Sequence, residues 1–327
     1  MKAVVYRNHG SPDVLEYQEI EMPVPESNEI LIKVRAASVN PLDWKIMKGG
    51  PRLVRLLLGL GKPKIRRPGV DVAGEVEAVG SNVTLFKPGD HVFGTCVGAF
   101  AEYVTSKPAS GMRSALVIKP DNLTFEQAAS APVAALTALQ GLRDKGRIQP
   151  GHSVLVNGAA GGVGTFAVQI ARTLGAKVTA VCSARNIAMV RSIGADQVID
   201  YTRQDFTQSG QRWDIVFDCV GNHSLSACRR VLNPKGTLVL VGMPNDAPVS
   251  GMVARLLAAW ALSPFLSRKM VFFIARVNQQ DLTAVGELMA TGKVTPVIDR
   301  SYRLSDAREA FQYMEQGHAS GKVILTP

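Results

Sequence analysis

Cysteine is scarce in this sequence of 327 residues, and its placement excludes two classes of protein. The four cysteines, Cys96, Cys182, Cys219 and Cys228, include no Cys-x-x-Cys pair, so neither a disulfide framework nor a cysteine-rich zinc lobe is indicated. Apolar runs of membrane-spanning length are also missing, and no signal-peptide apolar core follows Met1. We therefore expect a reduced, cytoplasmic protein.

Acidic residues are outnumbered, with 27 Asp and Glu against 37 Lys and Arg, which gives a formal net charge of +10. Most of the excess lies between Lys45 and Arg67, where eight basic residues occur without an acidic one. A solvated basic loop is the simplest interpretation, and contact with an anionic membrane surface or with cofactor phosphates stays open. Nucleic-acid binding is disfavoured because no aromatic residues interleave these charges and no recognition module accompanies them.

The most informative segment runs from Val154 to Gly164 and reads Val-Leu-Val-Asn-Gly-Ala-Ala-Gly-Gly-Val-Gly. An apolar, β-branched run ends there in a glycine-rich turn, and an alanine-rich amphipathic segment follows as far as Gly175, which predicts strand, turn and helix. Backbone N–H groups at the start of such a helix can bind a pyrophosphate. A second β-rich run at 177–182 completes the βαβ unit of a dinucleotide-binding domain. The cofactor-binding residues predicted in the turn are Ala159, Ala160, Gly161, Gly162, Val163 and Gly164.

On either side of this unit the chain shows two patterns. Residues 1–122 contain short β-branched runs separated by Pro, Gly and Asn, which predict an all-β domain such as a small, partly open barrel. From residue 153 onward, strands and helices alternate, which predicts a parallel sheet covered on both faces. The strands expected there lie near 153–157, 178–182, 197–199, 214–217, 237–241 and 269–275, and the helices near 162–174, 186–193 and 223–231. The fold class is therefore α/β.

The residues around the glycine-rich turn also resemble a known signature. Gly151, His152, Leu155, Gln169 and Arg172, with the turn itself, match the spacing of the quinone oxidoreductase and zeta-crystallin signature, in the zinc-free branch of the medium-chain dehydrogenase/reductase superfamily. The resemblance implies a GroES-like β-barrel catalytic domain, formed by 1–122 and completed by 278–327. It also implies a Rossmann NADP-binding domain with a doubly wound parallel sheet at 123–277, and a homodimer that pairs the β-prone edge at 269–275.

The preferred cofactor is indicated by the lack of an acidic residue after the second predicted strand. An NAD-specific site needs an acidic side chain near the end of the second strand, and Val178 to Ala195 contains neither Asp nor Glu. Ser183 and Arg185 are predicted to bind a 2′-phosphate instead, so the expected cofactor is NADPH. An N-capping serine followed by an exposed arginine is the alternative. By resemblance, Tyr201 reaches the same phosphate.

The ligands of a catalytic zinc are missing as well. By resemblance, the positions that hold zinc in the zinc-dependent members correspond to Asn40, Val70-Asp71 and residues 131–134, none of which is a cysteine or a histidine. The five histidines, His9, His91, His152, His223 and His318, show no metal-ligand spacing. We therefore expect no metal, and the loss of a Lewis acid disfavours simple alcohol oxidation.

The resemblance also implies residues of the reaction site. Asn40, Asp43 and Lys45 are expected on a loop that lines the nicotinamide, where Asn40 donates to a substrate carbonyl and Asp43 or Lys45 relays a proton. A turn with a buried asparagine that satisfies backbone groups is the alternative. The further cofactor contacts that the resemblance implies are Thr137, Cys219, Val241 and Gly242, with Lys322 near the phosphates.

We therefore expect an NADPH-dependent, zinc-independent oxidoreductase that reduces quinones or α,β-unsaturated carbonyls by hydride transfer. A non-catalytic NADPH-binding or nucleic-acid-binding protein of the zeta-crystallin kind and a zinc-free alcohol dehydrogenase stay as alternatives. The apolar segment 252–265 is expected to pack against the protein, either at the dimer seam or as a wall of the substrate pocket. In the alternative, it joins the apolar run 53–60 in contact with an anionic membrane surface.

Overall fold

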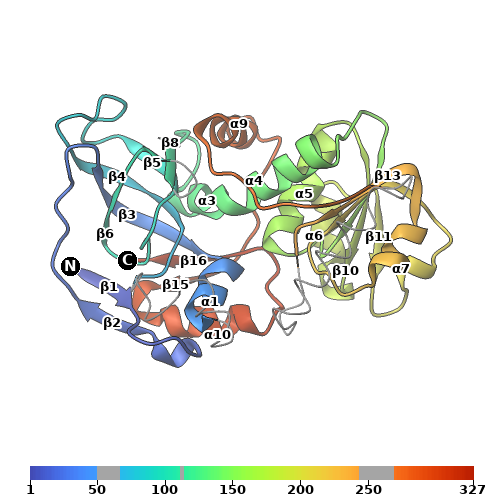
Figure 1. Cartoon of the computed structure of the whole chain (residues 1–327), viewed down its shortest axis with the longest axis horizontal. Helices are drawn as coiled ribbons and strands as arrows, with labels where there is room; N and C mark the ends of the chain where they lie inside the picture. Colours follow the sequence, from blue (N-terminus) through green and yellow to red (C-terminus); the bar gives the residue numbers. More distant parts are fainter. Residues whose placement is uncertain (50–66, 111–113, 243–268) are drawn as a thin grey trace. The chain divides into compact units, whose positions relative to one another are not determined.

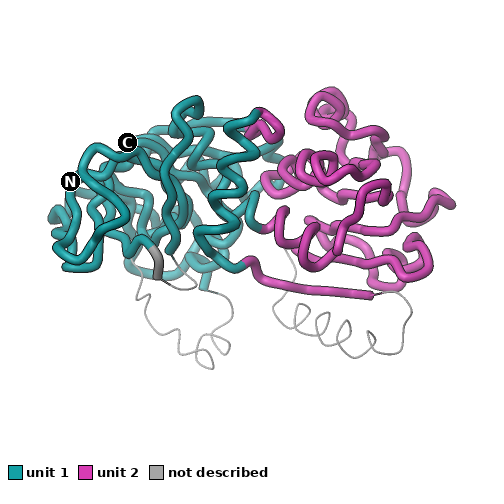
Figure 2. Tube along the Cα trace, turned by 90° about the horizontal axis from the view of Figure 1, so that it is seen from above, with its two compact units in different colours: residues 1–136, 276–291, 298–327 teal, residues 137–275, 292–297 magenta. Residues whose placement is uncertain are grey.

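The computed structural model describes residues 1–49, 67–110, 114–242 and 269–327. The segments 53–60 and 252–265 lie outside the described residues. The chain falls into two compact units (Figure 2). Unit 1 contains Met1–Leu136, Arg276–Thr291 and Ile298–Pro327, and unit 2 contains Thr137–Ala275 and Gly292–Val297.

Unit 1 continues to Leu136, which lies 14 residues beyond the domain boundary predicted from the sequence at 122/123. Helix α3 (Phe125–Ser130) explains the difference, since it packs on strands of unit 1. It begins with a capping box, in which Thr124 and Gln127 satisfy each other's backbone N–H groups. The predicted folding-domain boundaries stay a prediction.

Unit 1 is built on a mixed, mainly antiparallel sheet with the strand order β15-β16-β3-β4-β5-β8-β7, and β6 also pairs with β3 (Figure 1). The bounds of these strands are β3 (Ile30–Val39), β4 (Asp71–Val79), β5 (His91–Thr95), β6 (Tyr103–Ser106), β7 (Ala109–Ser110), β8 (Ser114–Ile118), β15 (Ile298–Arg303) and β16 (Lys322–Thr326). A separate hairpin joins β1 (Lys2–Val5) to β2 (Glu16–Glu19). The helices besides α3 are α1 (Pro41–Lys48), α9 (Gln279–Ala290) and α10 (Ala307–Glu315).

Apolar side chains from both ends of the chain form the core of unit 1. Phe100 and Phe311 meet edge to face, with ring centroids 5.9 Å apart. The C-terminal strand β16 pairs antiparallel with β3, with Val323 opposite Val39, and β3 pairs with β4 so that Ser38 lies opposite Asp71. The sheet therefore brings residues near 40, 71 and 322 together at one end.

Unit 2 contains a six-stranded parallel sheet with the order β11-β10-β9-β12-β13-β14. The strands are β9 (Ser153–Asn157), β10 (Lys177–Cys182), β11 (Gln197–Asp200), β12 (Trp213–Asp218), β13 (Leu232–Leu240) and β14 (Lys269–Phe272), and helices α5 (Gly162–Thr173), α6 (Ile187–Ser192) and α7 (Leu225–Arg230) lie in the connections. This order is that of the doubly wound dinucleotide-binding fold, and it reverses between β9 and β12. The predicted fold class is confirmed.

The segment after β3 differs from the prediction. Asn40 to Lys45 was expected on a loop, whereas the structure has helix α1, with Asn40 as its N-cap and Pro41 in the first turn. Asp43 completes a capping box with Asn40, and an Asn-Pro-Leu-Asp sequence supplies both partners locally. The helix ends at Gly49, which adopts a left-handed conformation with φ 69°.

Helix α4 (Pro132–Gln140) continues into a π-helical turn at Gly141–Lys145. Among the described residues, no helix is long and apolar enough to cross a membrane.

Candidate active site

The glycine-rich turn between β9 and α5 has the geometry of an anion-binding helix start. Helix α5 contains 12 residues, and its N-cap, Gly161, offers no side chain to the exposed N–H groups. A Cβ atom on Gly164 would lie 2.1 Å from the carbonyl oxygen of Gly158, so only glycine lets the helix pack here. A Cβ atom on Gly161 would meet nothing closer than 3.5 Å, so the protein itself does not require glycine there. The bare N-terminus therefore leaves room for a ligand phosphate.

The residues predicted to bind the rest of the cofactor lie at the carboxyl edge of the same sheet. Ser183 follows β10 and is the N-cap of a 3-10 helix, and its hydroxyl accepts a hydrogen bond of 3.3 Å from Asn186 Nδ2. Arg185 and Tyr201 are exposed, the tyrosine at 56%. An acidic residue, Asp200, ends the neighbouring strand, but its Oδ1 atom accepts from the backbone and the hydroxyl of Thr202 at 3.0 and 2.8 Å.

Cys219 marks the point where the strand order reverses. Its N–H donates to Asn157 O at 3.0 Å, which joins the ends of β9 and β12. Burial and the nearby Asp218 raise the pKa of the Cys219 thiol, which disfavours a nucleophilic thiolate. A Cβ atom on Gly242 would lie 1.8 Å from Cys219 O, so glycine is required where the end of β13 crosses this residue. In open α/β sheets, ligands bind in the crevice at this reversal.

The structure brings together most of the predicted cofactor residues of unit 2. Those at the carboxyl edge of its sheet are Ala159 to Gly164, Ser183, Arg185, Tyr201, Cys219, Val241 and Gly242. Thr137 is half-buried within α4, and it makes an interaction of its own. The steric gap over Gly161 and the glycines at 164 and 242 fit a dinucleotide, so these residues can hold the predicted cofactor.

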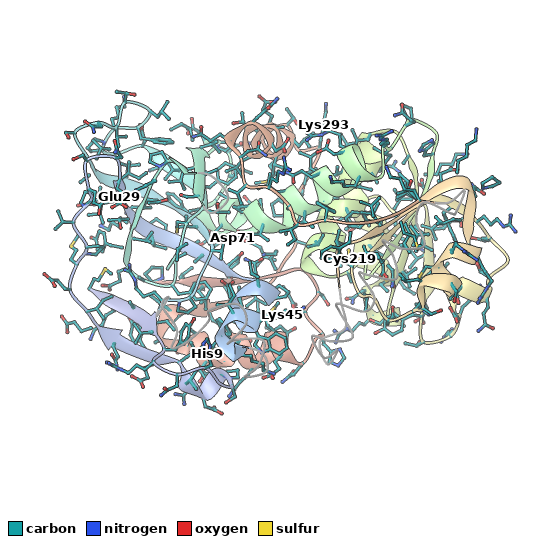
Figure 3. All side chains as sticks on the ribbon, viewed as in Figure 1. His9, Glu29, Lys45, Asp71, Cys219 and Lys293 are labelled. Atoms are coloured by element: carbon teal, nitrogen blue, oxygen red, sulfur yellow. The ribbon has the colours of Figure 1, made fainter. Side chains whose placement is uncertain are left out.

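Unit 1 contains a group of buried polar side chains that hydrogen-bond to one another. Asp71, one of them, is labelled in Figure 3. Lys322 Nζ donates to Asn40 Oδ1 at 2.6 Å and to Asp71 Oδ2 at 3.3 Å. Asn40 Nδ2 donates to the same Asp71 oxygen at 2.9 Å and to Ser38 O at 3.4 Å. The Ser38 hydroxyl adds a bond to Asp71 Oδ2 at 2.8 Å, and Val133 N at the start of α4 donates to Oδ1 at 3.0 Å. We call Ser38, Asn40, Asp71 and Lys322 the buried cluster, since each is at most 3% exposed.

Asp43 and Lys45 both belong to α1 but differ in their surroundings. Asp43 is buried, and its two carboxylate oxygens accept from the backbone N–H groups of Asn40 at 2.9 Å and Gly69 at 3.2 Å. Burial raises the pKa of Asp43 to about 7, against the lowering effect of these hydrogen bonds. Lys45 is exposed on the helix (Figure 3), and partial desolvation lowers the pKa of its ammonium.

The buried cluster changes the interpretation of two predicted residues. Both donor hydrogens of the Asn40 amide already have protein acceptors, although this amide was expected to donate to a substrate carbonyl. Lys322 was expected near the cofactor phosphates, and the structure buries it against Asn40 and Asp71, so the phosphate contact stays a prediction. Sequence analysis missed Ser38 and did not recognise Asp71 as a structural acid. An aspartate inside the otherwise apolar run 68–74 was the available signal.

In the part of the chain that the structure describes, no group of three or more His, Cys, Asp or Glu side chains could hold a metal ion. The three segments that correspond by resemblance to zinc-ligand positions do meet, through Asn40, Asp71 and Val133. Their meeting point contains an ammonium group and two side chains whose polar atoms are already hydrogen-bonded. These residues do not fit a zinc ion, because zinc requires free thiolate, imidazole or carboxylate donors.

Two parts of the chain match known protein families. Residues 26–115 match the alcohol dehydrogenase GroES-like domain, and residues 193–325 match a family described as zinc-binding dehydrogenase. The chain is 34% identical to the chloroplast envelope quinone oxidoreductase homolog of Arabidopsis thaliana, over 100% of this chain and 98% of that protein. It is 32% identical to the chloroplastic NADPH-dependent alkenal/one oxidoreductase of the same plant, over 100% of this chain and 80% of that protein.

A solved structure agrees with these relationships. The quinone oxidoreductase of Escherichia coli, solved in complex with NADPH, superposes with a TM-score of 0.85 at 26% identity, and the match covers 100% of both chains. The similarity extends over both units rather than the nucleotide-binding fold alone. The resemblance noted in the sequence is therefore confirmed: the chain belongs to the quinone oxidoreductases of the medium-chain dehydrogenase/reductase superfamily, and it is an oxidoreductase.

Proposed function

We propose that the protein is an NADPH-dependent, zinc-independent enzyme that reduces quinones or α,β-unsaturated carbonyls by hydride transfer. The observation that carries this proposal is the bare N-terminus of α5 at the reversal of strand order, with space over Gly161 and none over Gly164. The names of two relatives, a quinone oxidoreductase homolog and an NADPH-dependent alkenal/one oxidoreductase, support the substrate class.

The preference for NADPH over NADH rests on the end of β10. Ser183 and Arg185 lie there, and no acidic residue occurs between 178 and 195 to accept the ribose 2′-hydroxyl. Asp200, the nearest acid along the sheet edge, is engaged by Thr202. We assign the 2′-phosphate to Ser183 and Arg185, with Tyr201 as a third contact.

The nicotinamide end is assigned to residues of unit 2 at and near the strand reversal. Thr137, Cys219, Val241 and Gly242 hold the ring in this proposal, and the ring when bound supplies a hydride. The protein orients the nicotinamide ring and excludes water from it. The backbone there is fixed by the close approach of Gly242 to the carbonyl oxygen of Cys219, which leaves no room for a Cβ atom.

Reduction also requires a proton, and we assign its relay to Lys45 rather than Asp43. Asp43 is buried, and both of its oxygens are committed to backbone N–H groups. Lys45 is exposed, and its lowered pKa makes the ammonium a better acid than an ordinary lysine. Asp43 then has the structural task of fixing the start of α1.

We also propose a homodimer in the cytoplasm. Strand β14 is the edge of the parallel sheet and pairs only with β13 among the strands that the structure describes. An uncovered edge strand invites pairing with a second chain, and a dimer would cover it.

The proposal is tested by a substrate panel. Purified protein is mixed with NADPH or NADH and with quinones, short and long enones, and aldehydes, and cofactor oxidation is followed at 340 nm. We expect steady NADPH oxidation with quinones or enones. Absence of turnover despite tight NADPH binding would indicate a non-catalytic binding protein. NADP⁺ reduction by an alcohol without enone turnover would instead indicate an alcohol dehydrogenase.

A further inference from the structure

The loop that follows β12 at the reversal of strand order is held by two side chains that are not among the assigned cofactor contacts. It begins at Cys219, which is labelled in Figure 3, and runs to Asn222. Asp218, the last residue of β12, is fully buried, and Asn157, the last residue of β9, is 3% exposed. The two strands pair in parallel with Asp218 opposite Asn157, so both side chains lie on the same face of the sheet. We call these two residues the strand-end pair.

We propose that the strand-end pair positions this loop for the nicotinamide half of the cofactor, and that the position of the loop depends on Asn157. The inference rests on the proposed function, since that function assigns the nicotinamide end to residues that include Cys219, Val241 and Gly242. All of these residues belong to unit 2. Asn157 and Asp218 act through the loop, so they are positioning residues.

Asp218 holds the first half of the loop. Its Oδ1 atom accepts hydrogen bonds from the backbone N–H groups of Val220 at 3.1 Å and Gly221 at 2.8 Å, an arrangement typical of aspartate turns. Its backbone carbonyl oxygen accepts from Val241 N and Gly242 N, both at 3.0 Å. One residue thus holds both the loop and the backbone that follows β13.

Asn157 joins the residue before the loop to the last residue of the loop. Its Nδ2 group donates to Asp218 Oδ1 and to Asn222 Oδ1, both at 2.9 Å. An amide nitrogen carries only two hydrogens, so both are committed here. The backbone carbonyl oxygen of Asn157 also accepts from Cys219 N at 3.0 Å. Hydrogen bonds from this one residue therefore tie β9 to the start and to the end of the loop.

Two glycines let neighbouring backbone pack closely against the loop. Gly158 has a φ of 80°, and a Cβ atom there would lie 2.6 Å from Val220 Cγ2. A Cβ atom on Gly242 would lie 1.8 Å from Cys219 O. Because these contacts leave no room for even a methyl group, a loop released from Asn157 would also displace the backbone at Gly242, where the nicotinamide end is assigned.

Two nucleotides distinguish the ends of the cofactor in a binding experiment. NADPH carries both halves, whereas adenosine 2′,5′-bisphosphate carries the 2′-phosphate and lacks the nicotinamide. The 2′-phosphate contacts assigned to Ser183 and Arg185 follow a different strand, β10, so a change in the loop should affect only NADPH. The measured quantity is the Kd for adenosine 2′,5′-bisphosphate divided by the Kd for NADPH, which reports what the nicotinamide half adds to binding.

Asn157→Leu removes the donor and keeps a side chain of similar size. We expect the ratio of Kd values to fall by about 10-fold or more, the scale of a hydrogen bond to a charged group, while the Kd for adenosine 2′,5′-bisphosphate stays within about 2-fold. Asn222→Ala removes one neutral bond at an exposed residue, so the protein should fold normally and the ratio should fall by about 3-fold. If Asn157→Leu does not fold, Asn222→Ala decides the test.

Ser153→Ala is the matched control, because Ser153 and Asp214 form the same kind of pair at the opposite end of β9 and β12. The Ser153 hydroxyl donates to Asp214 Oδ2 at 2.8 Å. This pair lies roughly 13 Å along the strands from Asn157. Ser153→Ala should lower the melting temperature and leave the ratio of Kd values within about 2-fold of the unmodified protein.

An unchanged ratio in the variants that fold would overturn the inference. An equal fall of the ratio in Ser153→Ala, or an equal weakening of both nucleotides by Asn157→Leu, would overturn it too, since either result would mean that the pair stabilises the sheet as a whole. Failure of the unmodified protein to bind NADPH would contradict the proposed function and this inference with it. NADPH binding by the unmodified protein, with a ratio that Asn157→Leu and Asn222→Ala do not change, would contradict the inference alone.

Discussion

The glycine turn of unit 2 and the buried cluster of unit 1 are built in opposite ways. In the turn, Gly161 and Gly164 leave space because they have no side chains, and the backbone N–H groups of α5 provide the polar atoms. The cluster works by side chains, because Asn40, Asp71 and Lys322 satisfy one another in a space closed to solvent. The first arrangement is left open for a ligand, whereas the second is complete without one.

This difference implies different responses to substitution. A backbone site fails when an atom is added, and a side-chain cluster fails when a charge or a donor is removed. The two regions can therefore be tested separately, each with a matched substitution that differs in one physical respect.

The largest effect is expected in the turn, from Gly164→Ala. Its Cβ would lie 2.1 Å from Gly158 O, a backbone atom that cannot rotate away, and we expect a loss of about 3 kcal/mol or more in the free energy of unfolding. Gly161→Ala adds the same atom where the nearest neighbour is 3.5 Å away, so stability should change by less than about 1 kcal/mol while NADPH binding weakens at least 10-fold. Urea denaturation and fluorescence titration measure the two effects. Retained NADPH affinity in Gly161→Ala would mean that the cofactor does not approach this turn.

The next effect is a pH dependence of stability that has opposite signs in the two units. Burial raises the pKa of Asp43 to about 7, so the native state holds its proton more tightly than the unfolded chain does. The free energy of unfolding should then fall as the pH rises from about 4 to about 7, by at most about 1.4 kcal/mol per pH unit. Asp43→Asn should remove this slope in melting curves recorded between pH 5 and pH 8.

Asp214 in unit 2 is the matched control for that experiment. Burial alone would raise the pKa of Asp214, but hydrogen bonds from Ser153 and Asn233 outweigh it and lower the pKa. Its stabilisation is present above the usual pKa of an aspartate and is lost as the pH falls, so Asp214→Asn should destabilise the protein at neutral pH. Identical slopes for Asp43→Asn and the unmodified protein would show that Asp43 is not the titrating group.

The contrast between the regions also explains what the sequence predicted. The six parallel strands and the glycine turn were predicted because each is encoded within one short stretch, by apolar runs and by glycines at fixed spacing. The buried cluster joins residues 282 positions apart, and no local pattern encodes a hydrogen bond between Asn40 and Lys322. Helix α1 was missed for a different reason, because its capping box lies within an Asn-Pro sequence that also fits a turn.

A smaller effect is expected at the cofactor-specificity residues of unit 2. If Arg185 pairs with the 2′-phosphate, Arg185→Ala should lose roughly 1.5–3 kcal/mol of the preference for NADPH over NADH, the scale of a hydrogen bond to a charged group. Binding of NADH should be nearly unchanged, because NADH lacks this phosphate. Titration of both nucleotides against both proteins measures the difference. Equal affinity of the unmodified protein for NADPH and NADH would contradict the assignment.

The smallest effect separates charged from neutral hydrogen bonds inside unit 1. Ser38→Ala removes the 2.8 Å bond from the hydroxyl to Asp71 Oδ2, and we expect a loss of about 1.5 kcal/mol, the low end for a bond to a charged group because three other donors remain on Asp71. Ser106→Ala removes a bond of 2.6 Å between two buried, neutral hydroxyl groups, and it should cost about 1 kcal/mol or less. Urea denaturation of both variants measures the difference. A larger loss for Ser106→Ala would mean that packing, rather than charge, decides the contribution of these two hydroxyl groups to stability.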